Sequence, residues 1–323
     1  MKQEKIGFIG LGTMGFAMCY GLYKSGYLMI LPTYRREADQ SGSFTPLVPT
    51  LEAKTAAYDE MLNNGCEGAA NSAELFAKSD VIMISMPTSK QVEMNVYGPE
   101  GILENAKTGT LVIDLTSSDA SSTRKIAKDL EAKGIELLDA PISGGQAGAI
   151  NQTLTVMVGG KPEVFEKARP ILDTIGNPEK VTYVGPSGAG DAIKCINNFL
   201  SCTCLLASTE ALSAAVKAGI DPKVAAQVIG SSGGSSNATT YKFPNLIFTG
   251  QGMNMPVDLM KKDIGLFNAL TKELKVPGFY GNTTYNLFDI QSGSGHGMDD
   301  FSCVVRMFED WTGVRLWNID NES

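Results

Sequence analysis

Three glycines near the start of the chain constrain its fold more than any other feature. Gly10, Gly12 and Gly15 follow a strand-like stretch, Lys5–Gly10, and precede a helical stretch that begins at Met14. In the pattern G-x-G-x-x-G, the first glycine permits a tight turn, the second lets a ligand approach the main chain, and the third lets helix and strand pack closely. A helix N-terminus adds N–H donors and a partial positive charge that favour phosphate.

The turn therefore predicts a strand–turn–helix unit that binds the pyrophosphate of a dinucleotide. The alternative is a tight turn without a ligand, since 35 glycines make chance matches common. The cofactor-binding residues predicted in this turn are Gly10, Leu11, Gly12, Thr13, Met14 and Gly15.

The rest of the first half alternates apolar runs with helical stretches, which predicts an α/β domain with a parallel sheet. Gly26, Gly109 and Gly134 each end a helical stretch just before a strand, where a positive φ is often needed. Besides Lys5–Gly10, the predicted strands are Tyr27–Leu31, Val81–Met86, Thr110–Leu115, Ile135–Asp139, Thr153–Gly159 and Val181–Gly185.

The second half has a different pattern. Ala192–Ala218 is rich in Ala and Leu and has little charge before Lys217, which predicts a long buried helix. Shorter helical stretches follow at Pro222–Ile229, Pro256–Lys272, Thr284–Gln291 and Asp299–Thr312. We therefore predict a Rossmann domain over residues 1–186 and an all-α domain over residues 187–323, entered by the long interdomain helix.

Composition excludes several classes of function. Lys and Arg number 27 and Asp and Glu 35, a net charge of −8 without a basic cluster, which disfavours nucleic acid. The N-terminus lacks the apolar core of a signal peptide. The sequence contains no run of about eighteen apolar residues, so we predict no membrane-spanning helix. Six scattered cysteines indicate reduced thiols, so we expect a cytoplasmic protein. With His296 as the single histidine, a His-ligated metal or a Ser-His-Asp triad is disfavoured, and we predict no metal.

The choice of dinucleotide depends on the end of the second strand, about twenty residues after the last glycine of the turn. Tyr34, Arg35 and Arg36 stand there, and a guanidinium pairs well with a 2′-phosphate. This pattern favours NADP(H). NAD(H) is the alternative, because Glu37 and Asp39 lie close by and can accept a hydrogen bond from a ribose hydroxyl.

Two later segments have the composition of a site. In Asp139–Gly148, a strand ends just before Ser143, Gly144 and Gly145. A hydroxyl with exposed main-chain amides suits a carboxylate ligand; a structural turn is the alternative.

The second segment is Gly188–Asn198, in which Lys194 and Asn198 are four residues apart and share a helix face. A lysine on an apolar helix is a candidate general acid, whereas snorkelling or an ion pair with Asp191 is the structural alternative.

These residues resemble the β-hydroxyacid dehydrogenases, which include 3-hydroxyisobutyrate dehydrogenase and tartronate semialdehyde reductase. The resemblance covers Ile6 to about Val314 and is closest to the 3-hydroxyisobutyrate and 2-(hydroxymethyl)glutarate branch. It depends on GFIGLGTMG, DAPISGGQAG, GAGDAIKCINN and DLMKKDIGL, which occur in the family's order.

The resemblance implies a role for each matching position. Lys194 matches the catalytic lysine, Asn198 its partner, and Ser143, Gly144 and Gly145 the loop that holds the substrate carboxylate. The residues that match positions bordering the cofactor are Met86, Pro87, Thr116, Ser117 and Lys262. The family is commonly dimeric or tetrameric, so we expect a homodimer or homotetramer.

The expected activity is NAD(P)-dependent hydride transfer between a small anionic β-hydroxy acid, or a sulfonate analogue, and its semialdehyde. A non-catalytic NADP-binding sensor and an imine reductase-like enzyme are the alternatives; Lys194 disfavours the second, because imine reductases generally lack that lysine. One departure from the family is a Ser-, Pro- and Thr-rich insertion over residues 38–54, which we expect to be a loop near the ribose 2′-position.

Overall fold

The computed structural model describes residues 4–32 and 51–321, with the side chains of residues 51–55 left aside. The chain divides into two compact units, Met1–Lys194 and Cys195–Ser323. The division falls inside a helix, whereas the sequence pattern put the boundary between residues 186 and 187.

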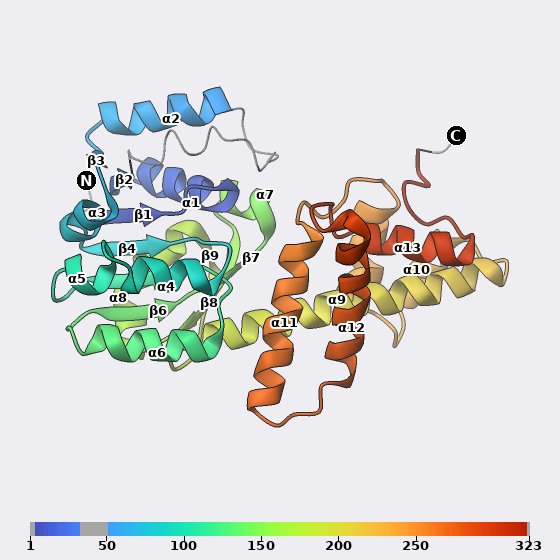
Figure 1. Ribbon diagram of the computed structural model, residues 1–323. Coiled ribbons are helices and arrows are strands. Elements are labelled where there is room, and N and C mark those ends of the chain that lie inside the picture. The colour runs from blue at the N-terminus through green and yellow to red at the C-terminus, as the bar shows by residue number, and fades with distance from the viewer. Residues whose placement is uncertain (1–3, 33–50, 322–323) are drawn as a thin grey trace. The chain divides into compact units, whose positions relative to one another are not determined.

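The first unit contains a nine-stranded sheet within the described residues, in the order β3-β2-β1-β4-β5-β6-β8-β7 with β9 beside β8 (Figure 1). The strands are β1 (Lys5–Ile9), β2 (Leu28–Pro32), β3 (Glu67–Ala69), β4 (Val81–Ile84), β5 (Leu111–Asp114), β6 (Glu136–Asp139), β7 (Ile142–Ser143), β8 (Leu154–Gly159) and β9 (Gly176–Gly185). The chain builds outward from β1 to β3 and then returns to β4 on the other side of β1, which makes a topological switch point between β1 and β4.

The expectation of a parallel sheet is correct for β3 to β6 and wrong for the far edge. β8 runs antiparallel to β6 and β7, although it is parallel to β9. The segment between β6 and β8 holds β7 and α7, and α7 has only 6 residues, too few for the helix that a parallel crossover normally uses to span the sheet. β3 and β7 are too short to show a period in the sequence, and the prediction omitted both.

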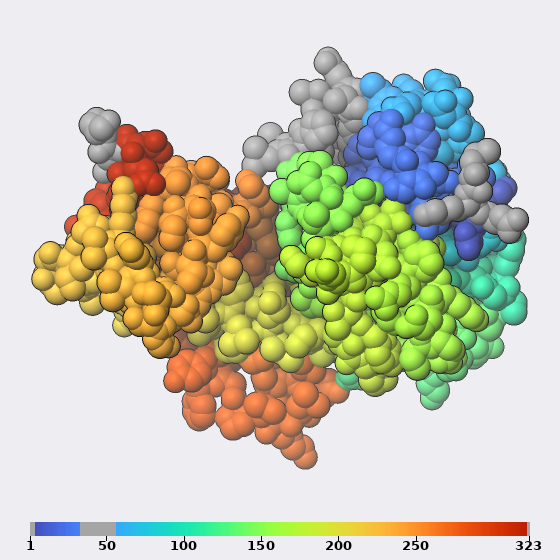
Figure 2. Space-filling view, turned by 180° about the vertical axis from the view of Figure 1, so that it is seen from behind, coloured from blue at the N-terminus to red at the C-terminus, as the bar shows by residue number. Residues whose placement is uncertain are grey.

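Helices cover both faces of this sheet. They are α1 (Thr13–Lys24), α2 (Leu51–Asn63), α3 (Ser72–Lys78), α4 (Ser89–Tyr97), α5 (Ile102–Asn105), α6 (Ala120–Glu131), α7 (Gly145–Ile150) and α8 (Pro162–Ile175). One core joins α1 and α8 to one face of the strands, and a second joins α3, α4 and α6 to the other. Figure 2 shows the face of this unit on which α1 packs against α7 and α8. Burial on both faces explains why the strands are apolar throughout rather than alternating.

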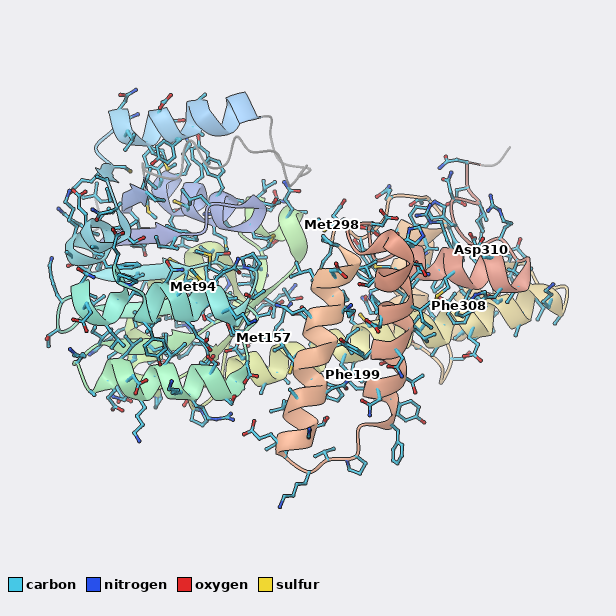
Figure 3. The ribbon with its side chains drawn as sticks, in the orientation of Figure 1. Met94, Met157, Phe199, Met298, Phe308 and Asp310 are labelled. Carbon is cyan, nitrogen blue, oxygen red and sulfur yellow. The ribbon has the colours of Figure 1, made fainter. Side chains whose placement is uncertain are left out.

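The second unit is helical in the described residues. Its elements are most of α9 (Ala189–Lys217), followed by α10 (Pro222–Gly230), the π-helix η2 (Ala238–Ile247), α11 (Val257–Glu273), α12 (Phe279–Gln291), the π-helical turn η3 (Ser292–His296) and α13 (Cys303–Thr312). Phe199 of α9, labelled in Figure 3, stacks on Phe267 of α11 with ring centroids 3.9 Å apart. The predicted helices are all present, with shifted ends, and η2 and η3 are additional.

The glycine and cysteine expectations are confirmed. Gly26, Gly109 and Gly134 have φ of 88°, 88° and 72°, as the change from helix to strand requires. Each of the six cysteines, all within the described residues, is a free thiol. By length and composition α9 alone among the described helices could cross a membrane, which is weak evidence because a helix in the core of a soluble protein passes the same test.

Candidate active site

The predicted glycine turn lies at the switch point between β1 and β4, where open α/β sheets bind their ligands. Gly10 has a φ of 89°, and a Cβ there would lie 2.0 Å from the main-chain oxygen of Ser85. A Cβ on Gly15 would lie 1.9 Å from the oxygen of Gly10. Both glycines are therefore needed for the close packing of the main chain, whether or not a ligand is bound.

Gly12 is different, because its φ is −69° and a Cβ at this position would meet no atom within 4 Å among residues 4–32 and 51–321. Gly12 is the exposed N-cap of α1, and the first turn of that helix carries no acidic residue. The protein thus leaves space in front of unobstructed helix N–H groups, which is the arrangement that a dinucleotide pyrophosphate requires. The turn fits the cofactor that the sequence predicts.

The structure also brings together the loops after β4 and β5. The main-chain N–H of Met86 donates to Thr116 Oγ1 at 3.0 Å, and a Cβ on Gly10 would lie 3.5 Å from the sulfur of Met86. Pro87 follows Met86 directly. The predicted cofactor residues Gly10, Met86 and Thr116 therefore share one edge of the sheet.

The structure does not describe the residues predicted to select between NADP(H) and NAD(H). β2 ends at Pro32, and Tyr34, Arg35 and Arg36 lie outside the described residues. The predicted loop over 38–54 is wrong at its end, because α2 begins at Leu51. Leu51, Glu52, Ala53 and Lys54 are all strong helix formers, which explains the helix there. The remainder, residues 38–50, lies outside the described residues.

The predicted carboxylate-binding loop begins in the short strand β7. Ser143 pairs with Thr155 of β8 and is half-buried, whereas Gly144 and Gly145 are exposed. Both glycines have positive φ, 132° and 62°, and a Cβ on Gly145 would meet nothing within 4 Å in the part of the chain that the structure describes. The main chain of this loop is accessible to a ligand, as the prediction requires.

Lys194 lies in the first two turns of α9 and is 9% exposed. The start of α9 approaches the sheet closely, because a Cβ on Gly190 would lie 2.4 Å from the oxygen of Met157 in β8. Gly188, with a φ of 86°, makes the turn that precedes the helix. Gly188 and Gly190 of GAGDAIK thus allow the turn and the close approach to β8 that position the helix carrying Lys194.

Three buried carboxylates, Asp114, Asp139 and Asp191, lie beside this helix start, and of these the sequence suggested a partner only for Asp191. Asp139 accepts hydrogen bonds from the N–H groups of Gly188 at 2.8 Å and Asp191 at 3.1 Å. Asp191 accepts from the N–H of Ser118 at 2.9 Å and from the hydroxyl of Thr123 at 2.7 Å. Both oxygens of Asp191, the suggested ion-pair partner of Lys194, therefore accept hydrogen bonds from Ser118 and Thr123.

Burial controls the protonation of these carboxylates. Burial raises the pKa of Asp114 to about 7, and the charge of Asp139 adds to the rise, against hydrogen bonds from Thr116 and Ser118. Burial likewise raises the pKa of Asp139 and of Asp191, the latter also through the neighbouring carboxylates. The three carboxylates of this buried cluster therefore have pKa values above the ordinary value of an exposed aspartate.

A pH-dependent stability follows from this burial. The pKa of Asp114 is raised in the fold, so its contribution to stability is fully present below about pH 4 and is lost as the pH rises through about 7. We expect Asp114→Asn, which cannot ionise, to stabilise the protein more at pH 8 than at pH 5, by on the order of a few kcal/mol. Urea unfolding at both pH values measures this, and an equal effect at both would contradict it.

In the second unit, Asn198 is held by Asp263, a residue that the sequence marked only as part of the segment DLMKKDIGL. The Asn198 side-chain amide donates to Asp263 Oδ2 of α11 at 2.5 Å, and both residues are buried. Lys262 Nζ lies 2.9 Å from the other oxygen of Asp263. Asp263 thus connects Asn198 and Lys262, the two predicted site residues of this unit. The segment DLMKKD could not indicate the contact of Asp263 with Asn198, because the two residues lie on helices that are far apart in the sequence.

A second buried lysine, Lys242 of η2, also escaped the sequence analysis. Its ammonium donates to the oxygen and the hydroxyl of Ser201 in α9, at 3.0 and 2.6 Å. Burial lowers the pKa of Lys242. Its contacts are those of a structural tie between η2 and α9.

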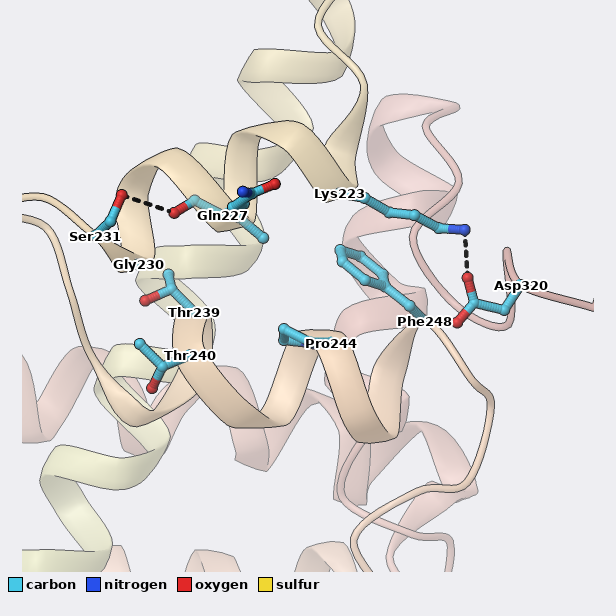
Figure 4. Close-up of a pocket in the computed structure, with 10 residues that line it drawn as sticks. Lys223, Gln227, Gly230, Ser231, Thr239, Thr240, Pro244, Phe248 and Asp320 are labelled. Carbon is cyan, nitrogen blue, oxygen red and sulfur yellow. Dashed lines mark hydrogen bonds and ion pairs between the residues drawn. The ribbon is translucent and has the colours of Figure 1, made fainter.

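A cavity of about 450 Å³ lies between α10 and η2 in the second unit, with Phe248 and Pro244 as its apolar wall and the ion pair of Lys223 with Asp320 at one end (Figure 4). Ser231, Thr239 and Thr240 line it, and each hydroxyl donates to the main chain nearby. It contains none of the predicted site residues.

Comparisons with known proteins identify the family. A family model described as the NAD-binding domain of 6-phosphogluconate dehydrogenase matches residues 47–185, and one described as the NAD-binding domain of NADP-dependent 3-hydroxyisobutyrate dehydrogenase matches residues 188–308. The chain is 37% identical over 316 residues to 2-(hydroxymethyl)glutarate dehydrogenase of Eubacterium barkeri, covering 98% of each chain. The chain belongs to the β-hydroxyacid dehydrogenase family.

Other members of this β-hydroxyacid dehydrogenase family match over similar lengths. NAD-dependent L-serine dehydrogenase of Pseudomonas aeruginosa is 31% identical, with 97% of this chain and all of that protein covered. The structure of Mycobacterium tuberculosis 3-hydroxyisobutyrate dehydrogenase with L-serine is similar with a TM-score of 0.80 at 25% identity, covering 95% of this chain and 99% of that one. The predicted family and the Rossmann-plus-helical fold are confirmed, and the chain is an NAD(P)-dependent oxidoreductase.

Proposed function

We propose that this dehydrogenase interconverts a small anionic β-hydroxy acid, or its sulfonate analogue, and the corresponding semialdehyde. The observation that carries the proposal is the anchored lysine: Lys194 is buried, yet it occupies a helix whose start is fixed to the carboxyl edge of the sheet, the edge that also bears the glycine turn. A lysine is expensive to bury, so its placement there favours a chemical role.

The names of the relatives support the substrate class. 2-(Hydroxymethyl)glutarate, L-serine and 3-hydroxyisobutyrate are all acids with a hydroxyl on the carbon next to the α-carbon. A hydroxy acid of this kind presents a carboxylate and a reacting hydroxyl at a fixed separation. The loop of Ser143, Gly144 and Gly145 suits the first group and Lys194 the second.

When bound, the nicotinamide dinucleotide accepts or supplies the hydride. In oxidation of the alcohol, Lys194 takes the hydroxyl proton as a general base; in reduction its ammonium donates a proton to the carbonyl oxygen as negative charge develops there. Asn198, oriented by Asp263, holds the hydroxyl or the lysine. Ser143 and the amides after it hold the acid group, so that the reacting carbon is oriented before the transfer.

For the cofactor we propose NADP(H) in preference to NAD(H), because Arg35 and Arg36 stand where a 2′-phosphate ligand is expected. Replacing both by Ala should raise KM for NADPH by about tenfold or more, the loss of a charge-assisted contact, and leave KM for NADH nearly unchanged. Steady-state kinetics with each cofactor measures the ratio. A wild-type enzyme that prefers NADH would contradict the assignment.

We propose a homodimer or homotetramer in the cytoplasm. Leu274 and Val276 between α11 and α12, and Phe279 and Tyr280 at the start of α12, are each more than half exposed, and neighbouring exposed apolar side chains are typical of a protein–protein interface. Sedimentation at several protein concentrations measures the mass of the assembly.

The test of the activity is oxidation of NADPH and NADH by purified protein with a panel of C3 to C6 semialdehyde acids, one sulfonated aldehyde and one cyclic imine. Turnover of a semialdehyde acid supports the proposal. Turnover of the imine alone would favour an imine reductase-like enzyme, and cofactor binding without any turnover would favour a sensor.

A further inference from the structure

We propose that Asp139 is a positioning residue for the reaction, acting through α9 on Lys194. The inference rests on the proposed function, since Lys194 is the proposed acid–base group. The observation behind it is that one buried carboxylate ends β6 and accepts two main-chain hydrogen bonds from the segment that begins α9.

The geometry makes Asp139 a clamp for the helix start. Its two oxygens accept from different residues, Gly188 at 2.8 Å and Asp191 at 3.1 Å, so the carboxylate fixes both the position and the direction of the first turn. Lys194 follows Asp191 by three residues, less than one helical turn. A tilt of this turn therefore moves the ammonium relative to the edge of the sheet.

The surroundings of Asp139 are built to hold that carboxylate. A Cβ on Gly159, the last residue of β8, would lie 2.7 Å from both carboxylate oxygens, and one on Gly190 would lie 2.9 Å from Oδ2. Glycine at these positions gives the carboxylate its space on two sides. Asp191 extends the clamp, because its carboxylate bonds Ser118 and Thr123, next to the loop that carries Thr116.

The test is Asp139→Asn, in which one of the two acceptor oxygens becomes an amide N–H donor. We expect kcat to fall by about 10²-fold, the effect of a small misplacement of a catalytic group, while KM changes by less than about threefold. Gly159→Ala should lower kcat in the same direction without changing any charge, because its Cβ displaces the carboxylate. Cofactor titration counts folded sites, so that kcat refers to the active fraction alone.

The matched control is Asp119→Asn. Asp119 is also a carboxylate that accepts two main-chain N–H bonds at a helix start, from Ser121 at 2.7 Å and Ser122 at 3.4 Å, but the helix is α6. We expect its kcat to stay within about threefold of wild type. A normal kcat in Asp139→Asn, or an equal loss in Asp119→Asn, would overturn the proposal.

Hydrogen exchange separates this inference from the proposed function. In Asp139→Asn the amides of Gly188 and Asp191 should exchange at least about tenfold faster than in wild type, whether or not a substrate has been found. If the wild-type enzyme turns over nothing in the panel, the proposed function fails while faster exchange still supports the clamp. Unchanged exchange at both amides would overturn the clamp itself.

Discussion

Replacing Lys194 by alanine is expected to lower kcat by about two to four orders of magnitude, the usual contribution of a general acid–base group. The ammonium stabilises the negative charge that develops on the substrate oxygen, so its loss affects the transition state more than the bound substrate. KM should therefore change much less than kcat. Steady-state kinetics with the best semialdehyde of the panel measures both constants.

The thermal stability of Lys194→Ala should rise or stay unchanged. Lys194 is 9% exposed, and alanine in its place is the best helix former. A loss of activity without a loss of thermal stability would identify the lysine as a group kept for chemistry. Lys217→Ala, at the exposed end of the same helix, is the control and should keep normal activity.

Partial rescue gives a second check on Lys194. A small primary amine added to Lys194→Ala should restore part of the turnover, because it supplies the missing ammonium, whereas it should do nothing for wild type. Near-normal turnover by folded Lys194→Ala would exclude the lysine as the acid–base group.

The parts of the fold that a short sequence window determines could be predicted. β1, the glycine turn and α1 form one continuous stretch whose apolar run and glycines each have a local cause, and the structure places them as expected. The direction of β8 could not be predicted in this way. An apolar run such as Leu154–Gly159 shows that a strand is buried but not which neighbour it pairs with, so its antiparallel pairing to β6 was missed.

The same limit applies to the candidate site. Lys194 could be singled out because a charge on an apolar helix is visible within a few residues. Asp139 and Asp263 owe their importance to contacts with Gly188, Asp191 and Asn198, which are tens of residues away in the chain. The position of Asp139 at the end of a buried strand is the one feature of the sequence that could have indicated its role.

Gly12→Ala is expected to weaken cofactor binding in a protein that remains folded. Its φ of −69° suits alanine and its Cβ would touch no atom of the described residues, so stability should change by less than about 1 kcal/mol. The methyl group would instead occupy the space in front of the α1 N-terminus, where the pyrophosphate is expected. We expect the Kd for NADPH to rise by at least about tenfold, measured by quenching of protein fluorescence.

Gly15→Ala is the matched comparison, because the two glycines belong to one motif but face different neighbours. A Cβ on Gly15 would lie 1.9 Å from the oxygen of Gly10, so the helix and strand must separate and the free energy of unfolding should fall by about 1–3 kcal/mol or more. Thermal unfolding without cofactor distinguishes the two variants. If Gly12→Ala binds NADPH as tightly as wild type, the space in front of α1 does not hold the pyrophosphate; if it is destabilised as much as Gly15→Ala, Gly12 serves the turn alone.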